Sequence, residues 1–328
     1  MTAPGALRDR PVKGTDLRLT ELAFGGASIG NLYTAVSDAS AIAAVEQAWE
    51  SGIRYFDTAP HYGLGLSERR LGAALARYDR ADLVISTKVG RLLVANESPT
   101  DHDDGGFMVP GAMSRRWDFS RDGVFRSVEE SLERLDMSRI DILYLHDPDQ
   151  SPFDDAIRTG AAALAELRDQ GVVRAIGIGS NSASAVARAF RETDIDLAML
   201  AGRYTLLEPR GADDVFAAAD GRSLVAAGIF NSGLLATPRP SAGSMYGYLP
   251  VSPTVLTRAQ HLADVAESVG WTLPQAALAF PLRNPAVASV AVGMRSRAQV
   301  SANVELLNSS PSPARWEAFE RSGLLATG

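Results

Sequence analysis

The feature that most restricts the fold of this chain is an eightfold alternation of short apolar runs with longer segments of helical period. The runs lack the polar alternation of half-exposed strands, as is typical of parallel strands buried on both faces. Because each run leads into a helix, the pattern favours a closed (β/α)8 barrel, or TIM barrel, over an open doubly wound sheet. The expected strands are residues 22–25, 53–56, 83–87, 140–145, 175–179, 197–200, 223–227 and 288–292.

The connecting segments carry apolar residues at helical spacing, commonly after a serine or threonine that can cap the first turn. Helices are expected at residues 39–51, 67–78, 120–135, 153–170, 182–191, 213–219 and 253–269, with others starting at 272, 297 and 312. Residues 1–12 read as a short polar leader, and residues 13–19 as a hairpin lid around Gly14-Thr15-Asp16. Two long stretches, 91–119 and 228–252, are expected to be loops. No break in composition divides the chain, so residues 1–328 are expected to form one domain.

Composition narrows the class of protein. The formal net charge of −7 argues against a nucleic-acid partner. The chain has no cysteine, which excludes disulfides, thiolate metal sites and cysteine nucleophiles. No apolar run has the length of a membrane span, and the first ten residues have no signal core, so a cytoplasmic location is expected. The four histidines follow no metal-ligand spacing, so no metal is expected.

Polar residues follow the second, third and fourth expected strands. Asp57 and Lys88 end two of them, His146 ends the next, and Tyr62 lies in the loop after Asp57. The carboxyl ends of barrel strands hold the active sites of this fold, and adjacent strands lie about 5 Å apart. An ammonium near a phenol lowers its pKa, and a carboxylate keeps that ammonium charged and oriented. These four residues therefore predict a proton-transfer site around a carbonyl or an alcohol.

Other interpretations remain open for each residue taken singly. A strand-end Lys88–Asp57 pair can be a rim salt bridge, His146 a structural histidine, and Tyr62 a packing residue. Lys88 can also be a Schiff-base nucleophile, although that chemistry needs a desolvated neutral lysine and Asp57 opposes it. What favours catalysis is the occurrence of four such residues on three consecutive strand ends.

The same residues resemble the signatures of the aldo-keto reductases. The resemblance covers residues 22–307 and rests on Phe56-Asp57-Thr58-Ala59-x-x-Tyr62-Gly63, Ser86-Thr87-Lys88, Asp141-x-x-x-Leu145-His146 and Ile178-Gly179-x-Asn181. Longer stretches look like the sugar dehydrogenase branch, which holds L-fucose (D-threo-aldose) and galactose dehydrogenases, and pyridoxal 4-dehydrogenase is also similar. These stretches are residues 57–68, 104–107, 117–120, 201–207 and 230–235.

The resemblance implies an NAD(P)-dependent oxidoreductase, with NADP(H) slightly favoured over NAD(H). In it, Tyr62 is the general acid and base, Lys88 and Asp57 tune it, and His146 orients the substrate. Ser180 and Asn181 are expected to hold the nicotinamide carboxamide, and Arg295 a 2′-phosphate at a helix start. The remaining cofactor candidates are Phe230, Asn231, Ser232, Gly233, Leu235, Gly293, Gln299 and Asn303. Arg295 and its neighbour Arg297 can equally be solvated helix-start charges.

Two departures from the family pattern concern the cofactor. Many members have a glutamine at the sixth strand end, where this chain has Ala201-Gly202. Many have a tyrosine under the nicotinamide, where it has Ala227-Gly228, and Phe230 is the candidate for the missing ring. No lysine stands beside Arg295, so the sequence leaves NAD and NADP open.

The two long loops carry the candidates for a substrate pocket. The first loop supplies Phe107, Trp117 and the carboxylates Asp103 and Asp104, and the second supplies Met245, Tyr246 and Tyr248. Aromatic faces with carboxylate acceptors suit a polyol ring, although such loops also pack their own small clusters. Arg203 either reaches this pocket or pairs with Glu208.

The predicted reaction transfers a hydride between C1 of an aldose hemiacetal and nicotinamide, giving a lactone. Pyridoxal oxidation and general aldehyde or ketone reduction are the enzymatic alternatives. A cofactor-sensing binding protein, like the potassium-channel β subunits that share such a barrel, is the non-enzymatic one. The only expected partner is a small sugar or aldehyde, and the chain is expected to be a monomer or a small homo-oligomer.

Overall fold

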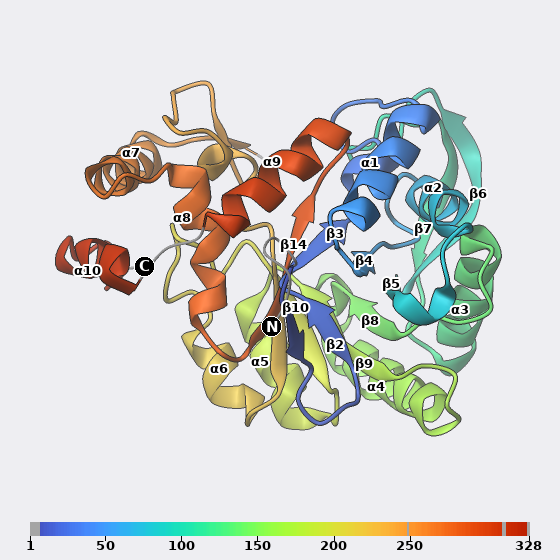
Figure 1. Cartoon of the computed structure of the whole chain (residues 1–328). Helices are drawn as coiled ribbons and strands as arrows, with labels where there is room; N and C mark the ends of the chain where they lie inside the picture. The colour runs from blue at the N-terminus through green and yellow to red at the C-terminus, as the bar shows by residue number, and fades with distance from the viewer. Residues whose placement is uncertain (1–6, 248, 310–312, 327–328) are drawn as a thin grey trace.

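Eight parallel strands close into a barrel in the computed structural model, which describes residues 7–247, 249–309 and 313–326 (Figure 1). The strands follow one another around the barrel in chain order, and the last pairs with the first. They are β3 (Leu22–Gly25), β4 (Tyr55–Asp57), β5 (Val84–Val89), β8 (Ile142–His146), β9 (Ala175–Ser180), β10 (Leu197–Ala201), β11 (Ser223–Ala227) and β14 (Val287–Gly293). The predicted (β/α)8 barrel is confirmed, and every expected strand lies within two residues of an observed one.

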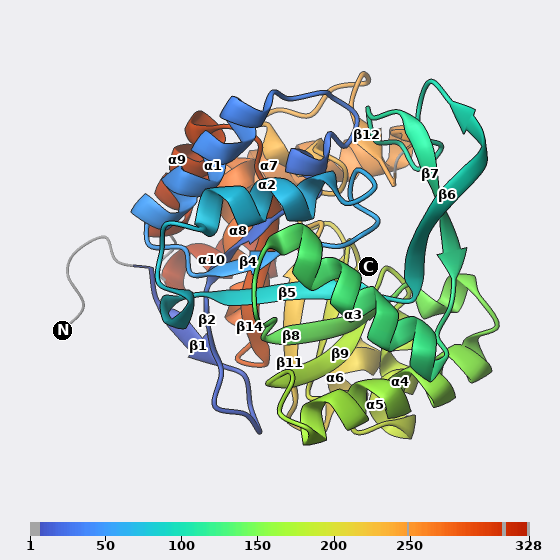
Figure 2. The ribbon, with the colours of Figure 1, turned by 90° about the vertical axis from the view of Figure 1, so that its right-hand side faces the viewer.

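Helices cover the outside of this barrel, one after each strand, with two additional helices near the C-terminal part of the chain (Figures 1 and 2). Those that follow the strands are α1 (Asp38–Glu50), α2 (Leu66–Leu75), α3 (Arg121–Leu135), α4 (Phe153–Asp169), α5 (Ala183–Glu192), α6 (Asp213–Ala219), α8 (Leu273–Ala279) and α9 (Arg297–Asn308). The additional two are α7 (Pro253–Ser268), which precedes α8, and α10 (Pro313–Arg321), which packs on α7. No helix in these described ranges has the length and apolarity to cross a membrane.

The starts of most of these helices are set by hydroxyl side chains. The side chain just before the helix accepts a hydrogen bond from an N–H of the first turn, which otherwise lacks a partner. This cap occurs at Ser37, Ser120, Ser182, Ser252, Thr272 and Ser296. These caps explain why the helix starts could be predicted closely from the sequence.

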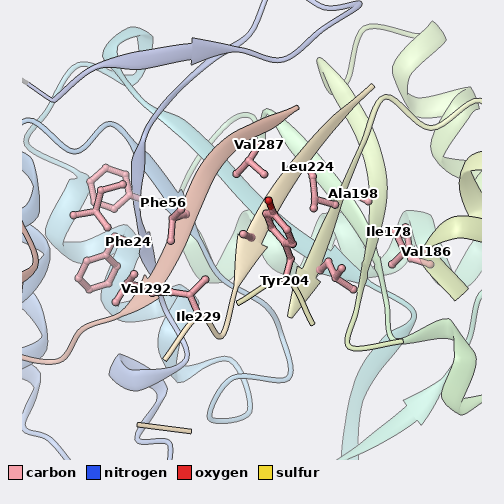
Figure 3. Packing of buried hydrophobic residues seen from close by; sticks show 14 of the residues in the cluster. Phe24, Phe56, Ile178, Val186, Ala198, Tyr204, Leu224, Ile229, Val287 and Val292 are labelled. Carbon is pink, nitrogen blue, oxygen red and sulfur yellow. The ribbon is translucent and has the colours of Figure 1, made fainter. Parts of the chain in front are cut away.

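Two apolar layers follow from the alternation of side chains along each strand. Residues that face outward, such as Phe24, Phe56 and Ile178, pack against the surrounding helices in the larger cluster (Figure 3). Residues that face inward, such as Tyr55, Tyr144 and Met199, fill the barrel axis in a second cluster. The barrel is therefore a packed core, and chemistry is confined to its rim.

A short hairpin closes the N-terminal end of the barrel. It consists of β1 (Asp9–Pro11) and β2 (Arg18–Thr20), and Val12, Leu17 and Leu19 are buried against the inward-facing cluster. The hairpin was expected at residues 13–19, with residues 1–12 as a polar leader. It begins earlier, since residues 9–12 belong to it; residues 1–6 lie outside the described ranges.

The two long loops contain strands that were not predicted. Residues 91–117 form a hairpin of β6 (Arg91–Thr100) and β7 (Gly111–Trp117), which projects beyond the C-terminal ends of the barrel strands (Figure 2). The second loop contains the 3₁₀ turn η4 (Leu234–Ala236) and a two-residue pairing of β12 (Met245–Tyr246) with β13 (Leu249–Pro250). The expectation of a long loop over residues 91–119 was wrong because Gly, Asp and Pro gather at the hairpin tip and mask the strands beside it.

Gly72 tests the packing of α2 on α3. A Cβ at Gly72 would lie 2.0 Å from the backbone oxygen of Leu135, which cannot move without shifting α3. Gly72→Ala should therefore destabilise the protein by about 2 kcal/mol, although alanine in a helix is ordinarily favoured over glycine by about 1 kcal/mol. Urea unfolding followed by circular dichroism measures the change.

Gly160→Ala in α4 is the matched control. Its Cβ would lie 2.9 Å from Cδ2 of Leu145 and 3.4 Å from Cδ1 of Phe119, both side-chain rather than backbone atoms, so a smaller effect than at Gly72 is expected. Equal free energies of unfolding for Gly72→Ala and the parent protein would contradict the packing described here.

Candidate active site

The four candidate catalytic residues meet at the C-terminal rim of the barrel. Asp57 ends β4, His146 ends β8, and Lys88 lies one residue before the end of β5, so the parallel register brings all three to one edge. Tyr62 lies in the loop after β4, whose position is fixed by a close contact with the 3₁₀ turn η1 (Ser28–Gly30). A Cβ at Gly63 would lie 2.2 Å from the oxygen of Gly30, so only glycine allows this approach.

An ion pair between Lys88 and Asp57 lies at the centre of the site. The Lys88 Nζ is 2.7 Å from Asp57 Oδ2 and also donates to the Thr58 carbonyl at 2.9 Å, and both side chains are almost fully buried. Burial alone would lower the pKa of Lys88, but the charge of Asp57, the neighbouring Tyr62 and the hydrogen bonds to both together raise that pKa above its ordinary value. Lys88 is therefore charged, which opposes the Schiff-base interpretation.

Asp57 is held from the inside of the barrel by a chain of hydroxyl groups. Ser86 Oγ donates to Asp57 Oδ1 at 2.7 Å, so its oxygen accepts from the Tyr55 hydroxyl at 3.0 Å. The Tyr55 oxygen in turn lies 3.1 Å from the hydroxyl of Tyr144. Burial raises the pKa of both tyrosines, so the chain is neutral and points its donors toward the carboxylate.

Tyr62 lies beside this ion pair, with its ring centroid 4.6 Å from Lys88 Nζ. Lys88 lowers the pKa of the phenol as expected, but burial is the larger effect, and the net pKa of Tyr62 is raised. The expectation of a net lowering was wrong for the protein chain on its own. Tyr62 is accordingly a protonated phenol next to a fixed ammonium.

Two neutral imidazoles border Tyr62. The His146 ring lies 5.9 Å from the Tyr62 ring and 5.4 Å from the His61 ring, centroid to centroid. Burial, with a smaller effect of the neighbouring Arg91 charge, lowers the pKa of His146 well below its ordinary value and that of His61 to about 2. The Arg91 Nη1 lies 3.5 Å from His61 Nε2, which must accept because a guanidinium has only donors.

Two arginines of the β6–β7 hairpin bring further charge to the site. Arg91 forms an ion pair with Asp147, and its guanidinium lies 4.4 Å from the ring centroid of Trp117. Arg115 makes two hydrogen bonds with Asp103, at 2.5 and 2.9 Å, and donates to the His61 carbonyl at 3.0 Å. Asp103, expected as a free pocket acceptor, is therefore buried and paired, while Asp104 is exposed.

The tip of the hairpin brings Phe107 to the site. Phe107 pairs with Leu32 in a β-bridge, and its ring lies 6.1 Å from that of Tyr62 and 5.2 Å from that of His61. Asn31 secures the tip, because its Nδ2 donates to the Met108 carbonyl and its carbonyl accepts from the Met108 N–H. Of the predicted substrate residues, Phe107 is the one in ring contact with Tyr62.

The predicted cofactor residues lie at the ends of β9 and β11. Ser180 donates its hydroxyl to Asp149 at 2.6 Å, and a Cβ at the preceding Gly179 would lie 3.6 Å from Lys88 Cε, which joins this strand end to the ion pair. Asn181 is exposed. The buried Asn231 has a side-chain oxygen without a hydrogen-bond partner, which is an unmet acceptor at the rim.

The loop after β11 differs from the expectation in detail. Phe230 is half-buried against the core, and Leu235 is fully buried. The N–H groups of Gly233 and Leu235 both donate to the Phe230 carbonyl, so they serve the turn itself. Ser232 and Gly233 are exposed. These two N–H groups are therefore not available to bind a phosphate, and other groups of the loop would have to do so.

A cationic side chain near the start of α9 forms no ion pair with the described residues. Arg295 is half-buried, and its guanidinium has no partner among the described residues, whereas Arg297 pairs with Glu50 at 2.6 Å. Gln299 accepts from the Arg295 N–H at 2.9 Å, and Asn303 donates to the Gln299 carbonyl. Gly293 precedes this turn, and a Cβ there would lie 2.7 Å from Ser28 Oγ.

The other three predicted substrate residues contact groups other than Tyr62. Trp117 stacks on Phe119 and on Arg91, and is 38% exposed. Arg203 pairs with Glu208 at 3.5 Å, and the hydroxyl of Tyr246 donates to the same Glu208. Arg203 also donates through Nε to the Asn181 carbonyl at 3.0 Å, so these residues lie beside the end of β9, and Tyr248 lies outside the described residues.

Ser86, His61, Arg91 and Asp147 were not singled out as site residues from the sequence. Ser86 stands within a strand, and Arg91 within a stretch expected to be a loop. Asp147 could have been identified from the sequence, because it directly follows the histidine at the end of a predicted strand. The described residues contain no group of three side chains placed to hold a metal ion.

A buried lysine–carboxylate pair lies beside a phenol and a neutral imidazole at the rim of a parallel barrel, an arrangement whose chemistry suits proton transfer. The model of the aldo/keto reductase family matches residues 21–322. The chain belongs to this family of oxidoreductases, whose members use nicotinamide cofactors.

Individual relatives span nearly the whole chain. It is 44% identical to D-threo-aldose 1-dehydrogenase of Pseudomonas sp over 316 residues, covering 95% of this chain and 96% of that one. It is 37% identical to pyridoxal 4-dehydrogenase of Microbacterium luteolum, covering 98% and 99%. Among solved structures it resembles the holo form of an aldo-keto reductase from Bacillus halodurans, with a TM-score of 0.75, 28% identity and 98% of each chain covered.

The buried neutral histidines predict a pH-dependent stability. His61 has a folded-state pKa far below that of the unfolded chain, so the unfolded chain binds the extra proton below about pH 6.5. Its contribution to stability is complete above that pH and is lost as the pH falls toward the folded value. His61→Gln should therefore flatten the fall in unfolding free energy between pH 6 and 5 by about 1.4 kcal/mol per pH unit.

Urea unfolding at several pH values measures this slope. His261→Gln, which removes an exposed imidazole from α7, is the matched control. Identical slopes for His61→Gln and the parent protein would show that His61 takes up its proton in the folded state.

Proposed function

We propose that this protein oxidises the C1 hemiacetal of an aldose of the L-fucose (D-threo-aldose) type to a lactone, with NADP or NAD as hydride acceptor. The observation that carries the proposal is the buried Lys88–Asp57 pair, 2.7 Å apart, with Tyr62 and His146 beside it. The 44% identity to D-threo-aldose 1-dehydrogenase over almost the whole chain supports the substrate class.

The residues act on the anomeric hydroxyl in complementary ways. His146, kept neutral by burial, donates an N–H to the reacting oxygen; its Nε2 is the nitrogen beside the Asp147 carboxylate, at 3.6 Å. Tyr62 in its phenolate form takes the hydroxyl proton, and Lys88 stabilises that anion. Asp57 keeps Lys88 charged and in place. In the reverse direction the protonated phenol, which burial favours, returns the proton.

A nicotinamide cofactor supplies the acceptor for the C1 hydride, so that loss of a hydride and a proton converts the hemiacetal to the lactone. The rim fits such a group. The unmet side-chain oxygen of Asn231 suits an amide donor, and the unpaired Arg295 at the start of α9 suits a phosphate. Ser180 keeps acceptor capacity after donating to Asp149.

Tyr62→Phe tests the proton transfer. The ring and its contacts remain while the hydroxyl is lost, so kcat for L-fucose should fall by about 10²–10⁴, the usual contribution of general acid–base catalysis. Nicotinamide absorbance gives the rate, and quenching of intrinsic fluorescence shows that the cofactor still binds. Near-normal kcat in a variant that binds cofactor would refute the role of Tyr62.

Arg295→Met tests the cofactor phosphate. If Arg295 binds a 2′-phosphate, the variant should raise KM for NADP about tenfold, the equivalent of one charge-assisted hydrogen bond of about 1.4 kcal/mol, and leave KM for NAD nearly unchanged. The neighbouring Arg297→Met, which breaks only the pair with Glu50, is the matched control. Equal changes for both cofactors would remove the assignment.

Pyridoxal is a second candidate substrate, because it forms an aromatic hemiacetal and Phe107 offers a ring beside Tyr62. The 37% identity to pyridoxal 4-dehydrogenase supports it. A panel of L-fucose, D-arabinose, L-galactose and pyridoxal with both cofactors separates the two proposals.

A further inference from the structure

We propose that Arg91 and Asp147 recognise the ring hydroxyls of the substrate and so select aldoses over simple aldehydes. This inference rests on the proposed function, since it concerns the same site. It assigns a binding role to a buried ion pair on the hairpin side of the tetrad of Asp57, Tyr62, Lys88 and His146. The pair is formed by the first residue of β6 and the residue after β8.

The pair borders the reacting centre. Asp147 Oδ2 lies 3.6 Å from His146 Nε2, and Arg91 Nη1 lies 3.5 Å from His61 Nε2. The His61 ring is 5.4 Å from that of His146. A sugar whose C1 oxygen contacts His146 therefore brings the hydroxyls of its neighbouring carbons to Arg91 and Asp147.

Arg91 retains donors that the protein does not use. Its Nη2 is bonded to Asp147 and Gln150, but Nε is buried without a partner and Nη1 has only the long contact with His61. The buried Arg70 behaves differently, since all three of its nitrogens are hydrogen-bonded to α1 and the loop before it. Arg70 is thus saturated as a structural residue, whereas Arg91 is not.

Asp147 likewise retains an acceptor. Its Oδ2 faces Arg91 and His146, while Oδ1 accepts no hydrogen bond from the described residues and is not sealed from solvent. Burial raises the pKa of this carboxyl, and the Arg91 charge opposes that rise. A hydroxyl donating to Oδ1 would stabilise the carboxylate further.

The backbone on both sides of the pair is unusual. Gly90, directly before Arg91, has a φ of 100°, and a Cβ there would lie 2.0 Å from the Phe119 ring. Asp147 has a φ of 42°, a left-handed conformation that few residues other than glycine adopt. These two turns direct both side chains toward the rim.

The chemistry of the pair fits a polyol. A guanidinium only donates and a carboxylate only accepts, whereas each sugar hydroxyl does both. Adjacent hydroxyls can therefore accept from Arg91 and donate to Asp147 at once. A simple aldehyde offers neither group, so its binding would leave these buried atoms unpaired, and sites of this kind discriminate against such analogues.

The competing explanation is that Arg91 only anchors the hairpin. Arg115 already does so, through Asp103 and the His61 carbonyl. Loss of an anchor would impair every substrate alike, whereas loss of a hydroxyl contact would impair only substrates that carry hydroxyls. The ratio of kcat/KM for L-fucose oxidation to that for propanal reduction distinguishes the two.

The experiment compares Asp147→Asn, Arg91→Lys and Arg91→Met with the parent enzyme. Asp147→Asn and Arg91→Met should lower this ratio by roughly 10- to 100-fold, since each removes contacts of a charged group. Arg91→Lys keeps the charge, so it keeps the test informative should Arg91→Met fail to fold, and it should lower the ratio less. Arg115→Met should lower both kcat/KM values and leave their ratio unchanged, and the exposed Arg116→Met should change neither value.

A constant ratio in all Arg91 and Asp147 variants would overturn the inference and leave the proposed function standing.

A binding measurement separates the inference from the reaction. Calorimetry of L-fucose with Tyr62→Phe protein and oxidised cofactor, with and without Asp147→Asn, reports recognition without turnover. If the parent enzyme oxidises no sugar but binding occurs and is lost with Asp147→Asn, recognition is supported and the proposed reaction fails. If no sugar is bound or oxidised, both proposals are wrong.

Discussion

The site depends on keeping one ammonium–carboxylate pair out of water. Two opposite charges 2.7 Å apart and almost fully buried are costly unless their remaining hydrogen bonds are satisfied. Here Thr58 supplies an acceptor for Lys88 and Ser86 a donor for Asp57. The fixed ammonium then gives Tyr62 a neighbour that stabilises its anion, while the surrounding burial favours the neutral phenol. In the proposed reaction, these opposing effects let Tyr62 both take and return a proton.

A second buried pair extends the site toward the hairpin. Arg91 and Asp147 leave donors and an acceptor unused beside His146, in contrast to the saturated Arg70. The tetrad and this pair divide the work between them in the proposed reaction: one group of charges acts on C1, and the other on the hydroxyls that distinguish a sugar from an aldehyde. The β6–β7 hairpin carries Arg91 and Phe107 and so contributes both polar and aromatic surface to the rim.

The barrel and the meeting of Asp57, Tyr62, Lys88 and His146 could be predicted because they follow from strand order and strand ends alone. The hairpin could not, since the tip residues Gly105 and Gly106 read as loop, and the pairing of Arg91 with Trp117 is a contact between distant residues. The shared contact of Arg203 and Tyr246 with Glu208 could not be predicted either, because Tyr246 is distant from both in the sequence. The sequence offered Glu208 only as one of two alternatives for Arg203. The raised pKa of Tyr62 depends on the degree of burial, which charge spacing in a sequence does not reveal.

The hydroxyl chain from Tyr144 through Tyr55 and Ser86 to Asp57 ends in the packed barrel axis, below which Val12, Leu17 and Leu19 of the β1–β2 hairpin are buried. Each hydroxyl donates its hydrogen bond toward Asp57, and among the described residues no hydrogen bond extends this series beyond Tyr144. This series of hydroxyls therefore ends inside the barrel and gives no hydrogen-bonded path through the described residues to the opposite face of the molecule. In the proposed reaction, the proton that Tyr62 takes therefore leaves on the rim side of the barrel, the side on which the sugar binds and from which the lactone departs.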